Sequence, residues 1–197
     1  MSVSSFVPDN YTAPSAGGGN YTKLQPGENR LRVLADQPLI GWQYWNTANK
    51  PVRSAYDAHP GNPADLRDGD KVKQCWWMKV YNYATKAIEI WEVAQVGLIN
   101  GIISYARHED YGNPVNYGFT ITKTGSGKET TYNLVAGVPK PLPAEIQKLS
   151  AETPVNLQAL LENGGNPFDT QPAPGTAATS AQAKNIAVPT EEDGLPF

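Results

Sequence analysis

Hydrophobic and polar residues alternate most regularly in residues 73–94, which read KQCWWMKVYNYATKAIEIWEVA. Successive side chains of a β-strand point to opposite faces of the sheet. The alternation places Trp76, Met78 and Val80 on one face, which we expect to belong to the core. The pattern predicts two strands joined by a short turn, a β-hairpin, and we expect the rest of the domain to be arranged around it.

The same alternation recurs in four other segments, which are residues 30–34, 41–46, 115–123 and 128–135. In the first of them, Leu31 and Val33 are expected to point inward, and Arg30 and Arg32 outward. The last two are separated by the glycine-rich sequence TGSG and therefore predict a second β-hairpin.

Apolar residues have helical spacing in residues 95–106, in spite of two glycines. The spacing predicts a short amphipathic helix whose inward face carries a set of five residues. These residues are Val96, Ile99, Ile102, Ile103 and Ala106.

In chain order these elements predict an all-β or β-rich domain. If residues 30–46 form one long, interrupted first strand, the domain has five strands with a short helix between strands 3 and 4. A five-stranded OB-type barrel has this order of elements. Other small barrels share it, so the order by itself does not identify the fold.

The second face of the hairpin has an unusual composition, because Trp77, Lys79, Tyr81 and Tyr83 alternate along it. A purely apolar core does not require a lysine among aromatic rings. Rings that alternate with a cation are suited to stacking bases and neutralising phosphates of single-stranded DNA. In the alternative interpretation, another part of the chain covers this face and makes it a second core layer.

A second group of candidate DNA-binding residues lies in residues 41–53, where aromatic residues precede two cations. Tyr44 and Trp45 are the candidate stacking residues, and Lys50 and Arg53 are the candidate phosphate ligands. At least one of the three aromatic residues in this segment must be in the core. Isolated cations elsewhere complete the predicted site, and these are Arg30, Arg32, Lys73, Lys86 and Lys123.

Charge is distributed unevenly along the chain. Residues 1–149 contain 15 Lys and Arg and 13 Asp and Glu, a net charge of +2, whereas residues 150–197 contain 1 and 6, a net charge of −5. A nearly neutral body can still carry a basic groove. The single cysteine and two histidines predict neither a disulfide nor a zinc site, so we expect no cofactor and no metal.

The two ends of the chain differ in composition from the middle. Residues 1–22 are rich in Ser, Gly and Pro, which predicts a flexible arm. We expect the folded domain in residues 23–149, a short helix and flexible linker in residues 150–190, and an acidic tip in residues 191–197. The tip is expected to bind partner proteins, or the body's own basic groove, through Glu191, Glu192, Asp193, Leu195, Pro196 and Phe197.

Catalysis is not favoured by any motif. His108 stands beside Glu109 and Asp110, but neighbouring residues do not converge on one substrate atom, and no known catalytic motif accompanies them. The sequence TGSGK lacks the spacing of a phosphate-binding loop. We therefore expect a protein without catalytic activity. No signal peptide or membrane-spanning segment is apparent, so we expect the protein in the reducing cytoplasm.

The ending EEDGLPF resembles the acidic tip of bacterial single-stranded DNA-binding proteins, which ends in Ile-Pro-Phe or Leu-Pro-Phe. The motifs KLQPGENRLRVL, GWQYWN and KPVR resemble bacteriophage-encoded single-stranded DNA-binding proteins over about residues 23–149. This resemblance implies an OB-fold that coats single strands without sequence specificity. It also implies a role in phage DNA replication, recombination or repair in the bacterial host cell, with the tip contacting replication proteins.

Two other functions remain open from the sequence. Exposed Trp and Tyr also stack on sugar rings, so a carbohydrate-binding module is one alternative. A non-catalytic structural phage protein whose aromatic residues are all buried is the other.

Overall fold

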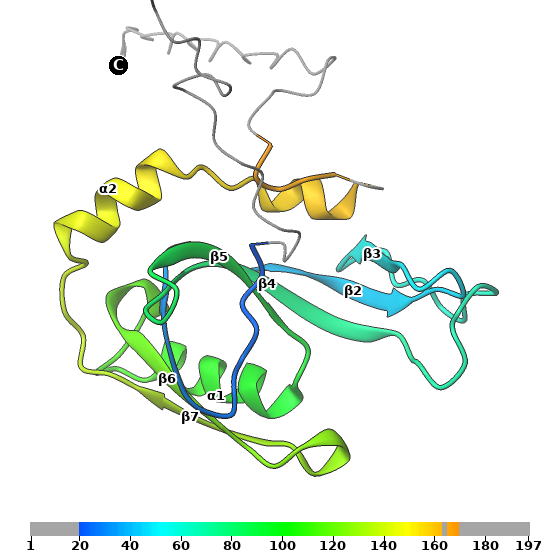
Figure 1. The fold of residues 1–197 in the computed structure, drawn as a ribbon, viewed down its shortest axis with the longest axis horizontal. Coiled ribbons are helices and arrows are strands. Elements are labelled where there is room, and N and C mark those ends of the chain that lie inside the picture. Colours follow the sequence, from blue (N-terminus) through cyan, green and yellow to red (C-terminus); the bar gives the residue numbers. More distant parts are fainter. Residues whose placement is uncertain (1–19, 163–164, 170–197) are drawn as a thin grey trace, which may run out of the picture.

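A seven-stranded antiparallel sheet forms the body of the protein (Figure 1). The computed structural model describes residues 20–162 and 165–169. The strands are β1 Gly27–Val33, β2 Leu39–Trp45, β3 Pro51–Ala55, β4 Lys73–Asn82, β5 Ala87–Val93, β6 Gly118–Thr124 and β7 Thr131–Ala136. The helices are α1 Val96–Arg107 and α2 Ala144–Glu152, with short 3-10 turns η1 Pro114–Asn116, η2 Gly127–Glu129 and η3 Leu157–Leu161.

Strand β4 is the longest strand, and it pairs along both edges. One edge is shared by two strands, because β1 pairs near Val80 and β2 pairs near Trp77. The other edge pairs with β5 over seven positions, from Trp76 to Asn82. The predicted hairpin of residues 73–94 is confirmed as β4 and β5, and it is the centre of the sheet.

The predicted five-stranded barrel is wrong, because the sheet has seven strands, although the β-rich class is confirmed. The strand order is β3-β2-β4-β1-β6-β7, with β5 paired to β4, and β5 and β7 are not paired in the described part of the chain. The expected single first strand is divided at residues 34–38, which end in Pro38. A proline cannot donate to a ladder, and after it the chain begins a separate strand, β2, that forms its own hairpin with β3. The helix α1 therefore lies between the fifth and sixth strands.

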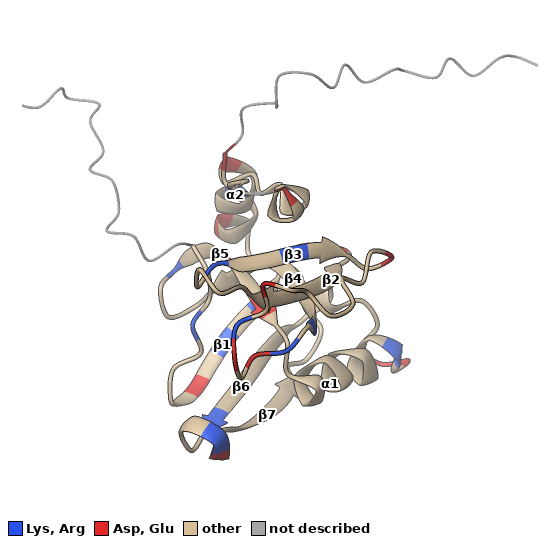
Figure 2. Ribbon diagram, turned by 90° about the vertical axis from the view of Figure 1, so that its right-hand side faces the viewer, with Lys and Arg blue, Asp and Glu red and all other residues tan. Residues whose placement is uncertain are grey.

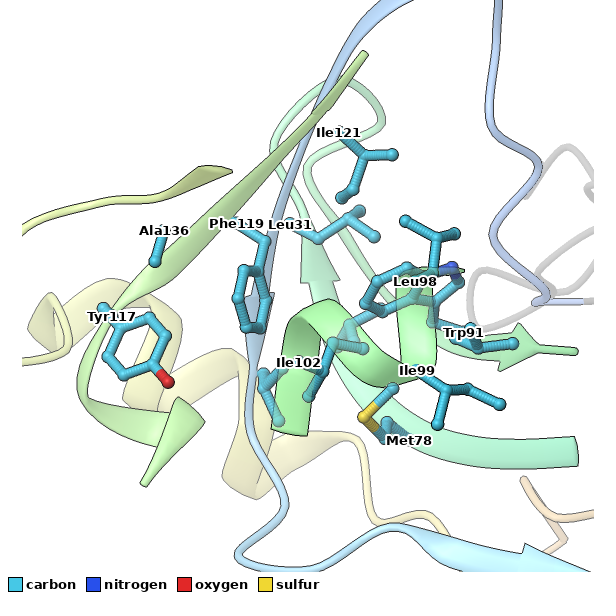
Figure 3. Packing of buried hydrophobic residues seen from close by; sticks show 13 residues of the cluster. Leu31, Met78, Trp91, Leu98, Ile99, Ile102, Tyr117, Phe119, Ile121 and Ala136 are labelled. Atoms are coloured by element: carbon cyan, nitrogen blue, oxygen red, sulfur yellow. The ribbon is translucent and has the colours of Figure 1, made fainter. Parts of the chain in front are cut away.

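The main core lies between the inner face of the sheet and α1 (Figure 3). Met78 and Val80 are buried in it, as the alternation predicted, while Trp76 is half-buried at its margin. Of the inward positions that alternation predicts for the other strands, Leu31, Val33, Tyr117, Phe119 and Ile121 are buried, whereas Tyr132 and Leu134 of β7 are half-buried at the margin of the core. The period-2 pattern therefore assigned the inner face correctly.

Helix α1 has the predicted position but a slightly different inner face. Val96 is 69% exposed, whereas Leu98 is buried together with Ile99 and Ile102. Val96 is the first helical residue, and it lies beyond the edge of the core. Gly101 is explained by packing, because a Cβ at this position would lie 3.0 Å from Cδ2 of Leu134 on β7.

A second core lies on the outer face of β4 and β5, where Cys75, Trp77 and Ile90 are buried against Leu160 of η3. Segments outside residues 23–149 complete it, because Phe168 packs there and Tyr21 forms a β-bridge with Ile90. The short helix expected after residue 150 corresponds to the 3-10 turn η3, and α2 extends across residue 149, the expected end of the domain. In Figures 1 and 2, α2 and the C-terminal segment lie on the side of β4 and β5 opposite to α1.

The second core predicts that η3 belongs to the folded domain. Replacing Leu160, which is 3% exposed, by alanine removes apolar contacts with Trp77 and should lower the free energy of unfolding by about 2 to 4 kcal/mol. Urea denaturation followed by circular dichroism measures the change. The control Val138→Ala, at an exposed site, should change it by less than about 0.5 kcal/mol. Equal stabilities of the two variants would show that η3 does not contribute to the fold.

Candidate nucleic-acid interface

The prediction that Trp77 faces DNA is wrong, because its side chain is 0% exposed. Its indole Nε1–H donates to Glu92 Oε2 at 2.9 Å, and its ring packs in the second core. Alternation correctly placed Trp77 on the outer face of the hairpin. It could not show that η3, some 80 residues later in the chain, covers this position. For this residue the interpretation as a second core layer is correct.

Arg53 lies on the same outer face and is engaged by protein groups. Its Nη2 lies 3.2 Å from Glu92 Oε2, and its Nε donates to Gln43 Oε1 at 2.7 Å. The guanidinium carbon also lies 5.7 Å from the ring centroid of Trp77. These contacts explain Arg53 as a structural cation at the end of the second core.

Burial, with the nearby Glu92 carboxylate, raises the pKa of Cys75 to about 12, so this thiol stays protonated.

Two more predicted cations lie beneath the C-terminal segment. Arg32 was expected to be exposed, but it is 1% exposed, and its Nη2 donates to the carbonyl oxygen of Lys140 at 2.8 Å. Lys79 is half-buried, and its Nζ donates to the carbonyl oxygen of Ser150 at 2.8 Å. Burial lowers the pKa of both side chains from their ordinary values.

Three of the predicted residues come together at the exposed end of this face, and we call them the tyrosine–arginine strip. They are Arg30 of β1, Tyr81 of β4 and Tyr83 directly after β4. The guanidinium carbon of Arg30 lies 4.4 Å from the ring centroid of Tyr83, and the two tyrosine rings meet edge to face at 5.0 Å. Arg30 is exposed and both tyrosines are half-buried. The strip therefore presents a cation and aromatic rings at the surface.

The β4–β5 turn holds the strip in place. The backbone N–H of Tyr83 donates to the carbonyl oxygen of Arg30 at 3.1 Å. Buried Glu89 accepts from Asn82 Nδ2 at 2.9 Å and from Thr85 Oγ1 at 2.7 Å, which fixes the turn residues. Lys86 is exposed in the same turn, with a positive φ of 55°. The turn thus places a second free cation near Tyr83.

The β2–β3 hairpin carries a second exposed ring and cation. Trp45 is 36% exposed, and the guanidinium carbon of Arg67 lies 5.6 Å from its ring centroid. Sequence reasoning missed Arg67, since it lies in a loop whose path no pattern predicts. Lys50 is exposed in the turn of this hairpin. Tyr44, which was expected to stack on DNA, is instead buried, and its hydroxyl donates to Asp65 Oδ1 at 2.9 Å.

The two exposed groups share one side of the sheet. Gln43 of β2 pairs with Lys73 of β4, so these two side chains lie on the same face of the sheet. Trp45 is two residues after Gln43 and therefore lies on the same face as Trp77, beyond the Lys73 end of β4. Tyr83 lies beyond the other end. Ten strand residues separate the two ends by about 30 Å, and the C-terminal segment covers the face between them. The sheet therefore has an outer face that is exposed at both ends and covered in the middle.

The other predicted cations have local partners. Lys73 Nζ lies 3.1 Å from Asp70 Oδ1, and Lys123 Nζ donates to the carbonyl oxygen of Leu24 at 3.1 Å. Lys and Arg are mixed with Asp and Glu along the described chain (Figure 2). The predicted tip, residues 191–197, and most of the predicted N-terminal arm lie outside the described residues.

An apolar groove on the opposite side of the sheet was not expected from the sequence. Two adjoining cavities of about 690 and 480 Å³ lie between β2, β4 and α1, and both are lined by Ile40 and Trp76. Tyr56, which is exposed and stacks at 6.2 Å on Trp42, lines the larger one. Amide side chains from Gln37, Gln74, Asn100 and Gln158 complete that wall. The groove thus offers rings and neutral polar groups.

His108 Nδ1 and Asp110 Oδ2 lie 3.7 Å apart, and both side chains are exposed. Within residues 20–162 and 165–169, no three His, Cys, Asp or Glu side chains are placed to hold a metal ion. None of the helices described in those ranges is long and apolar enough to cross a bilayer.

Asp70 fixes the loop that carries Arg67. Its Oδ2 accepts the backbone N–H of Trp45 at 2.8 Å, and its Oδ1 pairs with Lys73. Burial alone would raise the pKa of this carboxyl. The backbone N–H groups of Trp45 and Lys71, together with the Lys73 ammonium, outweigh burial, and the pKa lies below its ordinary value.

A carboxyl whose pKa is lowered on folding stabilises the protein above its ordinary pKa, and this contribution is lost as the pH falls through the lowered value. Asp70→Asn should therefore lower the free energy of unfolding at pH 7, and the difference from the wild type should shrink below about pH 4. Urea titrations at several pH values measure it. The exposed control Asp68→Asn should show little difference at any pH. A deficit independent of pH would contradict the role of the charge.

Comparisons of the chain with protein-family models, with curated proteins and with solved structures found no match.

Proposed function

We propose that the chain binds single-stranded DNA without sequence specificity and acts without catalysis. The observation that carries the proposal is the tyrosine–arginine strip, in which Arg30 lies 4.4 Å from the ring of Tyr83 and Tyr83 contacts Tyr81. Bases stack on such rings with about 1 to 3 kcal/mol each, and the cation neutralises the adjacent phosphate. Lys86 adds a second exposed charge.

The connectivity of the sheet supports a relative of the OB-fold. Strand β1 pairs with both β4 and β6, β4 pairs with β5, and β6 pairs with β7. With α1 between β5 and β6, these five strands follow the order of an OB core that is open between β5 and β7. The hairpin β2–β3 is then an insertion in the first connection. OB-folds bind oligonucleotides on the strand 2–3 face, which corresponds here to β4 and β5.

The biological setting that we propose follows from the resemblance of the sequence. The protein coats single strands during phage DNA replication, recombination or repair in the cytoplasm of the bacterial host. Trp45 with Arg67, at the far end of the outer face, serves as a second contact for the strand. Stacking and phosphate neutralisation at two places suit a protein that must bind any sequence.

Removing the strip should weaken DNA binding. Arg30→Ala should lower the affinity for fluorescein-labelled oligo(dT) about tenfold at low salt and reduce the slope of log affinity against log salt by about 1. Tyr83→Ala should also lower the affinity but leave the slope nearly unchanged, because it removes stacking and no charge. Fluorescence anisotropy at several salt concentrations separates the two effects.

Lys128→Ala provides the control, since this exposed cation lies in the β6–β7 connection, away from the strip. It should change the affinity much less than Arg30→Ala does. Wild-type protein that fails to bind oligo(dT) at low salt would rule out the proposed function. Equal effects of Arg30→Ala and Lys128→Ala would place the binding site elsewhere.

We also propose that the acidic tip, residues 191–197, binds replication or recombination proteins and competes with DNA for the basic surface. Phe197 suits a small apolar pocket of a partner protein, and the three acidic residues oppose phosphate binding. The three acidic side chains of the tip contribute three negative charges, and the net charge of the whole chain is −3.

Deleting residues 191–197 should tighten oligo(dT) binding about 3- to 10-fold at low salt, because a tethered competitor is removed. The gain should disappear as salt rises. Anisotropy titrations of the full chain and the deletion measure this. A control that replaces Leu195 and Pro196 by alanine keeps the acidic residues and should leave DNA affinity unchanged. Identical salt titrations of the full chain and the deletion would show that the tip does not compete.

The groove beside Trp76 favours a second candidate function, the binding of a carbohydrate. Its rings and amides suit a neutral sugar better than a phosphodiester strand. The two functions differ in salt dependence, because stacking on a neutral sugar releases no counterions. Salt-sensitive binding of oligo(dT) supports the first candidate and counts against the second.

A further inference from the structure

Two cations are held beneath residues 140–150, in the segment that contains α2, without a negatively charged partner. Arg32 lies on the outer face of β1, opposite Tyr81 of β4 in the register. Lys79 lies on the outer face of β4, two residues before Tyr81. Both cations are therefore neighbours of Tyr81. Each donates to one backbone carbonyl oxygen, that of Lys140 or that of Ser150. Among the described residues neither forms an ion pair, and Nε and Nη1 of Arg32 have no hydrogen-bond partner.

This arrangement is costly for a purely structural contact. A guanidinium has five N–H donors, and buried charges are stable when they are paired and fully hydrogen-bonded. Here burial opposes the charge on both side chains, as their lowered pKa values indicate. Arg53, on the same face, has Glu92 as its partner. The contrast singles out Arg32 and Lys79 as cations that lack an anion.

Helix α2 is anchored to the rest of the domain more weakly than η3 is. Only Ile146 is buried in α2, and no side chain caps its N-terminus. Cavities of about 360 and 330 Å³ flank the helix, one against β1 and the other against Tyr81. Between residues 138 and 155, the described hydrogen bonds to the rest of the domain are those of Arg32 and Lys79 and one from the Lys140 N–H to the Asn116 carbonyl.

The position of α2 is equally informative. It lies beside the tyrosine–arginine strip, and the cavity lined by Tyr81 is also lined by Glu145 and Glu152 of α2. Glu152 Oε1 lies 3.8 Å from Lys148 Nζ of the same helix, and among the described residues neither carboxylate forms an ion pair with Arg32 or Lys79. In Figure 1, α2 lies on the side of the sheet opposite to α1. Moving residues 138–152, which contain Lys140 and α2, away from the sheet would join Arg30, Arg32 and Lys79 into one basic track that contains Tyr81 and Tyr83.

We infer that Arg32 and Lys79 form a covered phosphate site, and that the segment of residues 138–152, which contains Lys140 and α2, moves off this site when a single-stranded nucleic acid binds. The inference rests on the proposed function and adds to it a second set of ligands and a cover. A phosphodiester supplies the acceptors that the guanidinium of Arg32 lacks, since planar Arg forks bind phosphate oxygens in pairs. The helix η3 stays in place, because Leu160 anchors it to Trp77.

The first test separates a ligand from a structural residue. Arg32→Met replaces a buried, unpartnered charge by an apolar side chain and should leave the free energy of unfolding unchanged or higher. It should nevertheless lower the affinity for oligo(dT) about tenfold and reduce the salt slope by about 1. Loss of stability with unchanged affinity would overturn the inference, because it would make Arg32 a structural residue alone.

The second test weakens the cover. Ile146→Ala removes the one buried side chain of α2 and should tighten oligo(dT) binding about 3- to 10-fold, because the open state becomes more populated. Leu134→Ala is the matched truncation, on β7 in the main core, and should not tighten binding. Weaker or unchanged binding by Ile146→Ala would contradict a cover.

Hydrogen–deuterium exchange of the full chain observes the movement directly. Saturating oligo(dT) should speed the exchange of the α2 amides while those of η3 stay protected. Unchanged or slower exchange in α2 would overturn the inference. One combination of results would rule out the covered site and leave the proposed function standing. In it, wild-type protein binds oligo(dT) and Arg30→Ala weakens this binding, but Arg32→Met and Ile146→Ala do not change the affinity and oligo(dT) does not change the exchange of the α2 amides. If oligo(dT) does not bind at all, the proposed function fails first.

Discussion

The structure depends on the burial of β4 on both of its faces and the pairing of both of its edges. Its inner face carries Met78 and Val80 against α1, and its outer face carries Cys75 and Trp77 against η3. One edge is divided between β1 and β2, and the other belongs to β5. A strand whose middle is covered on both faces and paired along both edges cannot move without unfolding the sheet, so it is a rigid base for the residues at its ends.

The candidate interface follows from this constraint. Because the middle of β4 is covered, the accessible cation–ring pairs of the outer face lie at the ends of the strand, with Tyr83 beside Arg30 at one end and Trp45 beside Arg67 beyond the other. Both pairs are cation–ring contacts and lie on the same side of the sheet. A single strand of DNA that joined them would have to cross the outer face, where α2 and η3 lie. The different anchoring of these two segments gives α2 a role that η3 cannot have.

The cations of the outer face have two kinds of hydrogen-bond partner. Arg53 has a carboxylate, Glu92, which also accepts from Trp77 and Gln43, and this network is complete. Arg32 and Lys79 have backbone carbonyl oxygens and no carboxylate among the described residues. Replacing a paired charge usually destabilises a protein, whereas replacing an unpaired buried charge often does not. The same face therefore combines a cation that is paired with a carboxylate and two cations that, among the described residues, have only backbone carbonyl partners.

The sequence by itself determined the β-rich class, the central hairpin, the helix after it and the inner face of the strands, because these depend on periodicity within short segments. It also placed Arg30, Tyr81 and Tyr83 on one face. Only the tertiary structure decided that Trp77, Tyr44 and Arg32 are buried, that Arg67 meets Trp45, and that the barrel is not closed. Alternation shows which residues share a face, but which face meets water depends on segments far away in the chain. Residues 140–168 supply that cover here, and no local pattern in β4 records it.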